Sequence, residues 1–487
     1  MSTTAATGFC RVTVVAPDSR IDVSLPVDIA VADIYPEILR LTGQTQAVGA
    51  PVGYHLVRRD GRVLDSSRTL ADERVLDGEV LSLRPFAESL PPTVYDDVSD
   101  AVASAVVRDR HLWSDELLRV AGLTGGALLL LLSGFVLWYS DPVRHDMHGL
   151  PGIIAAGLGV LLTAFAGVRA RVYGDRPAAI ASGLGVLPLL MIAGSGIISP
   201  SAGQGPGKLQ FMLGCVAVLV ASVVLVVLTP GGDAPFVATS FLSTAGTLAT
   251  FVALLADASA TAAASVCAPV AIGLLAFLPG LSARFARLPI GYASPRSATD
   301  DDLDPTQGAD AEPLDAERIA AQARRGHDML LGLVGGATAL VVASAAVLGF
   351  SDNVWGQLLA LAAGLAALIR ARLFRYTSQV TCVLVAGLAA IALLLLGLAL
   401  NPPAGALTEF LLHDDRGALD LRTAWLTAAV AAGAALVMAI GLIVPSKGLS
   451  PFWGRFLDLA ESTVLLSLVP LCLAVLGVLT DVRSMVG

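Results

Sequence analysis

The sequence predicts an α-helical polytopic membrane protein with a small soluble domain at its N-terminus. Of its 487 residues, 55% are hydrophobic and only 15% are charged, and the mean hydropathy is +0.74. A soluble domain carries about 25% charged residues, so this composition excludes an ordinary cytosolic enzyme and a disordered chain. The net charge of −9 gives no basic surface for nucleic acid. Five widely separated cysteines fit neither a disulfide framework nor a zinc site.

The N-terminal domain is predicted over residues 1–90, which have an ordinary soluble composition. Ile34, Ile38 and Leu41 share one helical face, and Gly43 is placed to end that helix. Pro36 fits poorly inside it, which leaves open where the helix starts and whether it kinks. Segments rich in β-branched residues, with turn residues between the first two, predict strands over 9–15, 21–27, 53–57 and 80–83. The predicted order is therefore β-β-α-β-β.

The stretch Thr69–Arg84 narrows this to a ubiquitin-like β-grasp, although another small α/β domain is the alternative. It resembles the closing stretch of ubiquitin-like domains, in which a leucine and a valine fill the core before an Asp-Gly turn and the last strand. The chain continues through Pro85 and Phe86 with no diglycine tail, so conjugation is not expected. Met1–Thr4 lacks the basic segment of a signal peptide and no apolar core follows. The domain is therefore expected to remain cytoplasmic.

After residue 120 the chain becomes strongly apolar and predicts about eleven transmembrane helices, since each needs roughly 20 apolar residues. The fifth and sixth are separated only by Ala256-Asp257-Ala258, so ten helices are possible. The expected helices cover 120–139, 149–168, 178–198, 209–228, 235–255, 258–279, 329–350, 354–370, 379–400, 423–444 and 462–480. The corresponding division is a 1–90 domain, a 91–119 linker with a juxtamembrane segment, helices 1–6 over 120–279, an acidic cytoplasmic loop over 280–328 and helices 7–11 over 329–487.

Basic residues predict the orientation. With the N-terminus in the cytoplasm, 17 Lys and Arg residues lie near the spans on the inside and 5 on the outside. This bias predicts a cytoplasmic N-terminus and a periplasmic C-terminus. Two pairs of arginines on the cytoplasmic side occupy equivalent positions. Arg169 and Arg171 lie at the end of the second span, and Arg370 and Arg372 lie at the end of the eighth. A Ser-Asp pair also follows both the first span (Ser140-Asp141) and the seventh (Ser351-Asp352). Because these matches keep the same order, they suggest a parallel duplication of six and five spans.

The central loop carries the candidate docking residues. Asp300, Asp301, Asp302 and Asp304 belong to a run of eight acids between Ser297 and Glu317 that contains no Lys or Arg. A short helix is expected from Pro313 to Arg325, leading into the seventh span. We hypothesise that the acidic run and this helix form a strip that docks a basic partner surface. The docking candidates are Asp300, Asp301, Asp302, Asp304, Arg324 and Arg325.

The search for catalytic, cofactor and metal motifs returns none. Secondary transporters usually keep ionisable residues in their spans, and these spans hold almost none. Asp257, Asp458 and Glu461 are expected at the membrane interface. A secondary transporter or permease with a regulatory ubiquitin-like domain is the alternative, since eleven spans and a duplication suit it. No residue supports a membrane-embedded enzyme.

The Thr69–Arg84 stretch joined to eleven spans and a long central cytoplasmic loop resembles the EccD family, the integral-membrane component of mycobacterial ESX (type VII) secretion systems. The pattern is most similar to the paralogue of the iron-linked ESX system. The resemblance covers nearly the whole chain and implies a non-catalytic inner-membrane scaffold without a cofactor. It implies a homodimer that encloses a membrane vestibule in contact with lipids. It also implies a larger complex with EccB, the ATPase EccC and EccE as partners.

Overall fold

The computed structural model describes residues 8–16, 19–43, 53–85, 114–201, 205–231, 233–286, 316–447 and 450–478. The chain divides into two compact units, Met1–Trp113 and Ser114–Gly487. The boundary falls inside the expected 91–119 linker, most of which lies outside the described residues.

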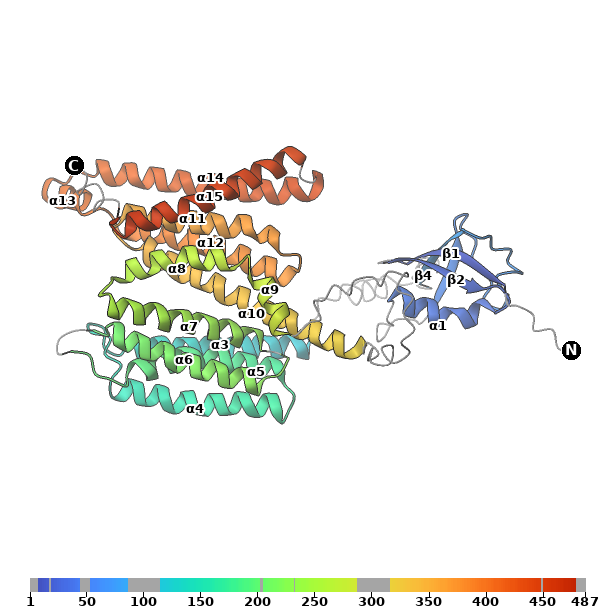
Figure 1. Cartoon of the computed structure of the whole chain (residues 1–487), viewed down its shortest axis with the longest axis horizontal. Coiled ribbons are helices and arrows are strands. Elements are labelled where there is room, and N and C mark those ends of the chain that lie inside the picture. Colours follow the sequence, from blue (N-terminus) through green and yellow to red (C-terminus); the bar gives the residue numbers. More distant parts are fainter. Residues whose placement is uncertain are drawn as a thin grey trace, which may run out of the picture. The chain divides into compact units, whose positions relative to one another are not determined.

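The N-terminal unit is a four-stranded sheet with one helix packed on it (Figure 1). The strands lie in the order β2-β1-β4-β3, with β1 and β4 parallel and the other neighbours antiparallel. This is the β-grasp arrangement, so the predicted fold is confirmed. The elements are β1 (Phe9–Val15), β2 (Arg20–Pro26), α1 (Val31–Thr42), β3 (Tyr54–Arg58) and β4 (Val80–Pro85).

The core of this unit lies between α1 and the sheet, where Ile34 and Ile38 pack with Val14 and Leu56. The start of the helix, which the sequence left open, is Val31. α1 continues through Pro36, and the proline removes only one backbone donor from the helix. The helix ends at Gly43, whose φ of 69° is the left-handed conformation that glycine adopts readily.

The Thr69–Arg84 stretch forms the expected closing segment. Leu70 is fully buried and Val75 packs against the same core. Gly78, with φ of 84°, completes the turn, and the neighbouring Asp77 carboxylate accepts a 2.6 Å hydrogen bond from the Arg11 N–H. The turn is thereby fastened to β1, and β4 enters the sheet beside it.

The second unit is a bundle of long apolar helices (Figure 1). In the described part of the chain, ten helices are long and apolar enough to cross a membrane, and an eleventh span is formed if the bent pair α8–α9 counts as one. The two helices of that pair meet at 68°. The helices are α3 (Asp115–Trp138), α4 (Leu150–Arg171), α5 (Arg176–Ser195), α6 (Lys208–Leu228), α7 (Ala234–Leu255), α8 (Ala260–Leu274), α9 (Leu278–Phe285), α10 (Ala316–Gly349), α11 (Val354–Arg370) with the 3₁₀ turn η2 (Ala371–Leu373), α12 (Thr377–Leu400), α13 (Ala404–His413), α14 (Gly417–Lys447) and α15 (Pro451–Val475).

Helix α10 lies at the centre of the bundle. It packs on α7 and α8, which precede the central loop, and on α11 and α12, which follow it. The largest core cluster surrounds it and is built mostly from alanine, valine and leucine, including Val334, Ala337, Val341 and Ala345. By contrast, α3, α14 and α15 have almost no fully buried residue along their apolar stretches.

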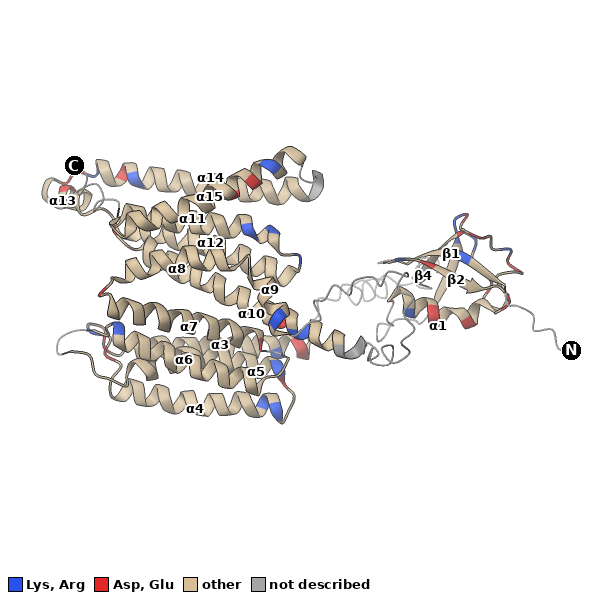
Figure 2. Ribbon diagram, in the orientation of Figure 1, with Lys and Arg blue, Asp and Glu red and all other residues tan. Residues whose placement is uncertain are grey.

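The helix ends differ from the expected loop boundaries. α9 reaches Phe285 and α10 begins at Ala316, so both helices extend into the region expected as the 280–328 loop. The short helix expected up to Arg325 is continuous with the seventh span. Charged residues gather at the two ends of the bundle, and its middle is almost free of them (Figure 2).

Candidate functional site

The docking candidates divide between described and undescribed parts of the chain. Asp300, Asp301, Asp302 and Asp304 lie outside the described residues. Arg324 and Arg325 are exposed on the first turns of α10. Their proposed role in docking therefore stays a prediction.

One juxtamembrane ion-pair cluster joins the first three membrane helices. Asp175 precedes α5 and is only 8% exposed. Its carboxylate pairs with Arg119 of α3 and Arg169 of α4. It also accepts a 3.2 Å hydrogen bond from the Ala178 N–H, which caps the start of α5. A single acidic side chain thus holds together the start of α3, the end of α4 and the start of α5.

The charge environment of Asp175 favours its ionised form. Burial alone would raise the pKa of the Asp175 carboxyl. The Ala178 N–H and the two guanidiniums outweigh burial and hold that pKa below its usual value. Nearby, the Arg171 guanidinium donates to the Val227 carbonyl at the end of α6, so it satisfies a carbonyl that the helix leaves unpaired.

A second cluster joins the end of α11 to α15. Arg372 lies 2.7 Å from Asp458 and 2.6 Å from Glu461. Arg370 lies 3.6 Å from Glu461 and donates a 2.8 Å hydrogen bond to the Ile272 carbonyl of α8. The four juxtamembrane arginines predicted from the sequence, Arg169, Arg171, Arg370 and Arg372, therefore all fasten helix ends to one another.

A charge exchange tests the second cluster. Arg372→Glu is expected to lower the free energy of unfolding by about 2 kcal/mol, because it places like charges together at a partly buried site. Adding Glu461→Arg restores an opposite pair and should recover part of that loss. The measurement is thermal unfolding of the detergent-solubilised protein. Asp458→Asn serves as the mild control, since the Asp458 side chain is 70% exposed. A double variant no more stable than Arg372→Glu alone would contradict the pairing.

An exposed ion pair lies at the opposite end of the bundle. Lys208 is the first residue of α6, and its Nζ lies 2.9 Å from the Oδ1 of Asp257, in the turn between α7 and α8. The Lys208 ammonium holds the pKa of the Asp257 carboxyl below its usual value. The same Nζ lies 3.4 Å from the Ala253 carbonyl. Asp257 thus lies in an exposed turn between two helices, and its place at the membrane interface stays a prediction.

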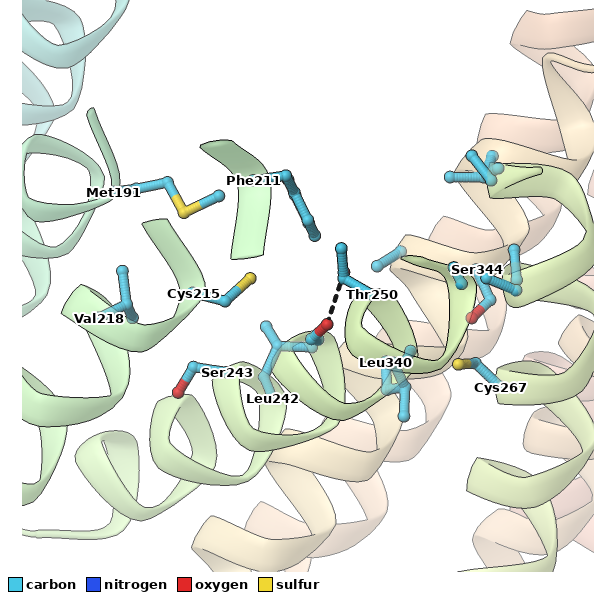
Figure 3. Close-up of a pocket in the computed structure, with 18 of the residues that line it drawn as sticks. Met191, Phe211, Cys215, Val218, Leu242, Ser243, Thr250, Cys267, Leu340 and Ser344 are labelled. Carbon is cyan, nitrogen blue, oxygen red and sulfur yellow. Dashed lines mark hydrogen bonds between the residues drawn. The ribbon is translucent and has the colours of Figure 1, made fainter. Parts of the chain in front are cut away.

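An apolar cavity of about 780 Å³ extends from this ion pair along α7 (Figure 3). Its walls come from α5, α6, α7, α8 and α10, and Figure 3 shows Met191, Phe211 and Cys215 on one side with Leu340 and Cys267 on the other. A second apolar cavity of about 740 Å³ lies against α7 as well and shares several lining residues with the first. Sequence reasoning missed both cavities.

The oxygen-bearing side chains along the cavity are hydroxyls of α7 and α10, and the hydroxyls on α7 donate to carbonyls of their own helix. The Thr250 hydroxyl, for example, donates to the Gly246 carbonyl (Figure 3). Among the described residues, no group of three or more His, Cys, Asp or Glu side chains could hold a metal ion. The arrangement offers surfaces for packing and for apolar ligands.

The two parts of the chain match known protein families. Residues 118–485 match the family described as the EccD-like transmembrane domain. The chain belongs to the EccD family. Its N-terminal residues 9–83 match the WXG100 protein secretion system protein YukD, over the range of the β-grasp unit. The predicted family is confirmed over both parts of the chain.

Curated relatives of this EccD-family chain come from Mycobacterium tuberculosis. The ESX-4 secretion system protein eccD4 of strain H37Rv is 28% identical over 99% of this chain and 98% of its own length. The ESX-2 secretion system protein eccD2 of strain CDC 1551 / Oshkosh is 25% identical over 90% of this chain and 89% of its own length. Neither relative belongs to the paralogue that the sequence pattern favours, which stays a prediction.

Two solved structures share the fold. Protomer 1 of the ESX-3 core complex contains a chain that is 19% identical, with a TM-score of 0.57, covering 97% of this chain and 100% of that one. The MycP5-free ESX-5 inner membrane complex in state II contains another, 21% identical, with a TM-score of 0.53, covering 88% of this chain and 99% of that one. Both agree with the N-terminal sheet followed by a helical bundle.

Proposed function

We propose that this EccD-family protein is a non-catalytic membrane scaffold subunit of a type VII (ESX) secretion complex. The observation that carries the proposal is the distribution of charge. The apolar spans keep their ion pairs at the helix ends, where these fasten α3 to α5 and α11 to α15. A scaffold needs such a rigid wall, whereas a coupled transporter needs ionisable groups within its spans.

The scaffold would sit in the bacterial inner membrane with its N-terminus in the cytoplasm and its C-terminus in the periplasm. The excess of Lys and Arg on one side of the spans supports this orientation. The clusters around Asp175 and Glu461 would then lie on the cytoplasmic side, and the Lys208–Asp257 pair on the periplasmic side.

Homodimerisation would cover apolar surfaces that one copy leaves open and would close a membrane vestibule between two copies. Along the apolar stretch of α14, no residue is buried within the single chain. Large side chains such as Trp425, Leu436 and Ile440 are exposed there. Helices α3 and α15 have nearly as few fully buried residues. In lipid, such faces associate through close packing of small and apolar side chains.

The cytosolic surfaces would dock the other subunits. The resemblance implies EccB, EccC and EccE as partners, with the ATPase EccC supplying the energy for export. The ubiquitin-like domain and the strip that includes the acidic run 300–304 are the proposed docking elements. Solved complexes named as the ESX-3 core complex and the ESX-5 inner membrane complex contain chains of the same fold, which supports placement in a large assembly.

Gentle detergent extraction followed by sizing and mass spectrometry tests this function. We expect a particle far larger than a dimer that contains an ATPase subunit. A lone monomer or dimer that binds a small solute would instead support the transporter alternative.

Reversing the acidic strip tests docking separately. Changing Asp300, Asp301, Asp302 and Asp304 to arginine is expected to release a partner from the particle, because a basic surface would then be repelled. The four matched Asp→Asn changes should have a smaller effect. An intact complex after full reversal would contradict the docking strip without affecting the scaffold assignment.

A further inference from the structure

Helix α7 is packed asymmetrically. It packs closely on α6 and α10 but makes little contact with α8, although α8 follows it directly in the chain. The turn between them is short, and Asp257 within it has a left-handed φ of 48°. The two apolar cavities lie beside α7, where it is separated from α8. The bundle therefore contains a crevice around α7, defined here by the residues that line the two cavities.

The chemistry of the crevice suits a hydrocarbon chain. Its lining is dominated by alanine, leucine and valine, with Met191 and Phe211 among the larger side chains. The cavity volume of about 780 Å³ falls within the range of small-molecule sites. Phe211 is 50% exposed, so the crevice opens at the surface of the bundle, where bilayer acyl chains lie. Water would find few partners in such a space.

The mouth of the crevice carries one charge of each sign. Lys208 lines the cavity, together with Pro206 and Gly207 at the start of α6. Its partner Asp257 is a fully exposed carboxylate only 2.9 Å away. A purely anionic headgroup that approached Lys208 would be repelled by Asp257. A headgroup with a phosphate and an ammonium group matches both residues.

We propose that the crevice around α7 holds an acyl chain of a zwitterionic phospholipid, phosphatidylethanolamine, whose phosphate pairs with Lys208 and whose ammonium pairs with Asp257. The site is complete within one copy of the chain, so it needs no second copy to form. It goes beyond the proposed scaffold role and does not depend on which subunits assemble. The bound lipid would fill the space between α7 and α8 and support the position of α7.

Lipid binding can be measured by native mass spectrometry of the full chain released from nanodiscs that contain equal amounts of phosphatidylethanolamine and phosphatidylglycerol. We expect one retained phosphatidylethanolamine per copy. Ala249 lines both cavities, so Ala249→Phe should lower retention about tenfold by filling the space. The matched control is Ala428→Phe on the exposed face of α14, which should leave retention unchanged.

The mouth is tested by two further variants that keep the crevice intact. Lys208→Gln should lower retention about fivefold, because one charged contact to the headgroup is lost. Asp257→Asn should shift the preference toward phosphatidylglycerol. Equal retention in Ala249→Phe and Ala428→Phe would overturn the crevice as the site. Preferential retention of phosphatidylglycerol by the unaltered chain would overturn the zwitterionic assignment.

Discussion

Replacing Gly336 with leucine is expected to lower the free energy of unfolding of the membrane bundle by about 3 kcal/mol, at the upper end of overpacking changes. A Cβ atom at this position would lie 2.7 Å from the Ala238 carbonyl oxygen and 2.7 Å from the Phe241 Cβ of α7. One turn earlier, a Cβ at Gly332 would lie 2.6 Å from the Ala234 carbonyl oxygen. The two glycines let α10 approach the backbone of α7, and backbone atoms cannot move aside as a flexible side chain can.

The measurement is thermal or SDS-induced unfolding of the solubilised protein, followed by loss of the monodisperse peak in size exclusion. Gly433→Leu on α14 is the matched control, because nothing lies within 4 Å of a Cβ there. Gly335→Leu should fall between the two, since its nearest neighbour is the Ala238 Cβ at 3.3 Å. Equal losses at positions 336 and 433 would show that α10 and α7 do not meet in this way.

The small residues show what the sequence can and cannot predict about the bundle. Hydropathy predicted the ten described helices that are long enough to span and also the bent pair α8–α9, because the bilayer sets the length of each apolar stretch. It could not predict which face of a helix packs, since the faces toward lipid and toward protein are equally apolar. Gly159 and Gly183 sit tightly against Leu190 and Phe236, whereas Gly157 on the same helix as Gly159 has nothing within 4 Å.

The soluble domain was predictable in more detail because one side of its sheet faces water. Alternation of apolar and polar residues then reports both the strand and its buried face, as it does for Val12 and Val14 in β1. The sequence left the start of the helix open at Pro36, and the helix continues through it, since packing of Ile34 and Ile38 outweighs the one donor that the proline removes. Tertiary burial commonly overrides such a local preference.

The ion pairs were only half predictable. The sequence predicted Arg370 and Arg372 at the end of the eighth span, and the structure places them at the end of α11 and in η2. Asp458 and Glu461 were expected at the membrane interface. Their pairing spans about ninety residues of sequence and depends on α15 returning beside α11, which no local pattern encodes. Asp175 went unnoticed, although an Asp before Arg-Pro at the start of a helix is a typical N-cap. The cavities depend on helix packing alone.

Removing the Asp175 carboxylate is the second large expected effect. Asp175→Ala should lower the free energy of unfolding by about 3 kcal/mol, because it leaves two guanidiniums unpaired near a protein surface and removes a helix cap. Asp175→Asn keeps an oxygen that can accept from the Ala178 N–H, so it isolates the charge. Asp175→Asn should therefore lower the free energy of unfolding less than Asp175→Ala does. Asp257→Asn is the control, since that carboxylate is fully exposed and its removal should change stability little.

The pH dependence separates the charge of Asp175 from its shape. Because the folded pKa of this carboxyl lies below the usual value of about 3.9, the carboxylate stabilises the folded state at every pH above the unfolded pKa. That contribution decreases as the pH falls through the folded pKa, where the carboxyl becomes protonated in both states. The difference in free energy of unfolding between the unaltered chain and Asp175→Asn should therefore be constant from about pH 5 to 7 and should decrease at lower pH. A difference that persists unchanged well below pH 3 would mean that Asp175 acts through hydrogen-bond geometry, and that the two arginines are not held by its charge.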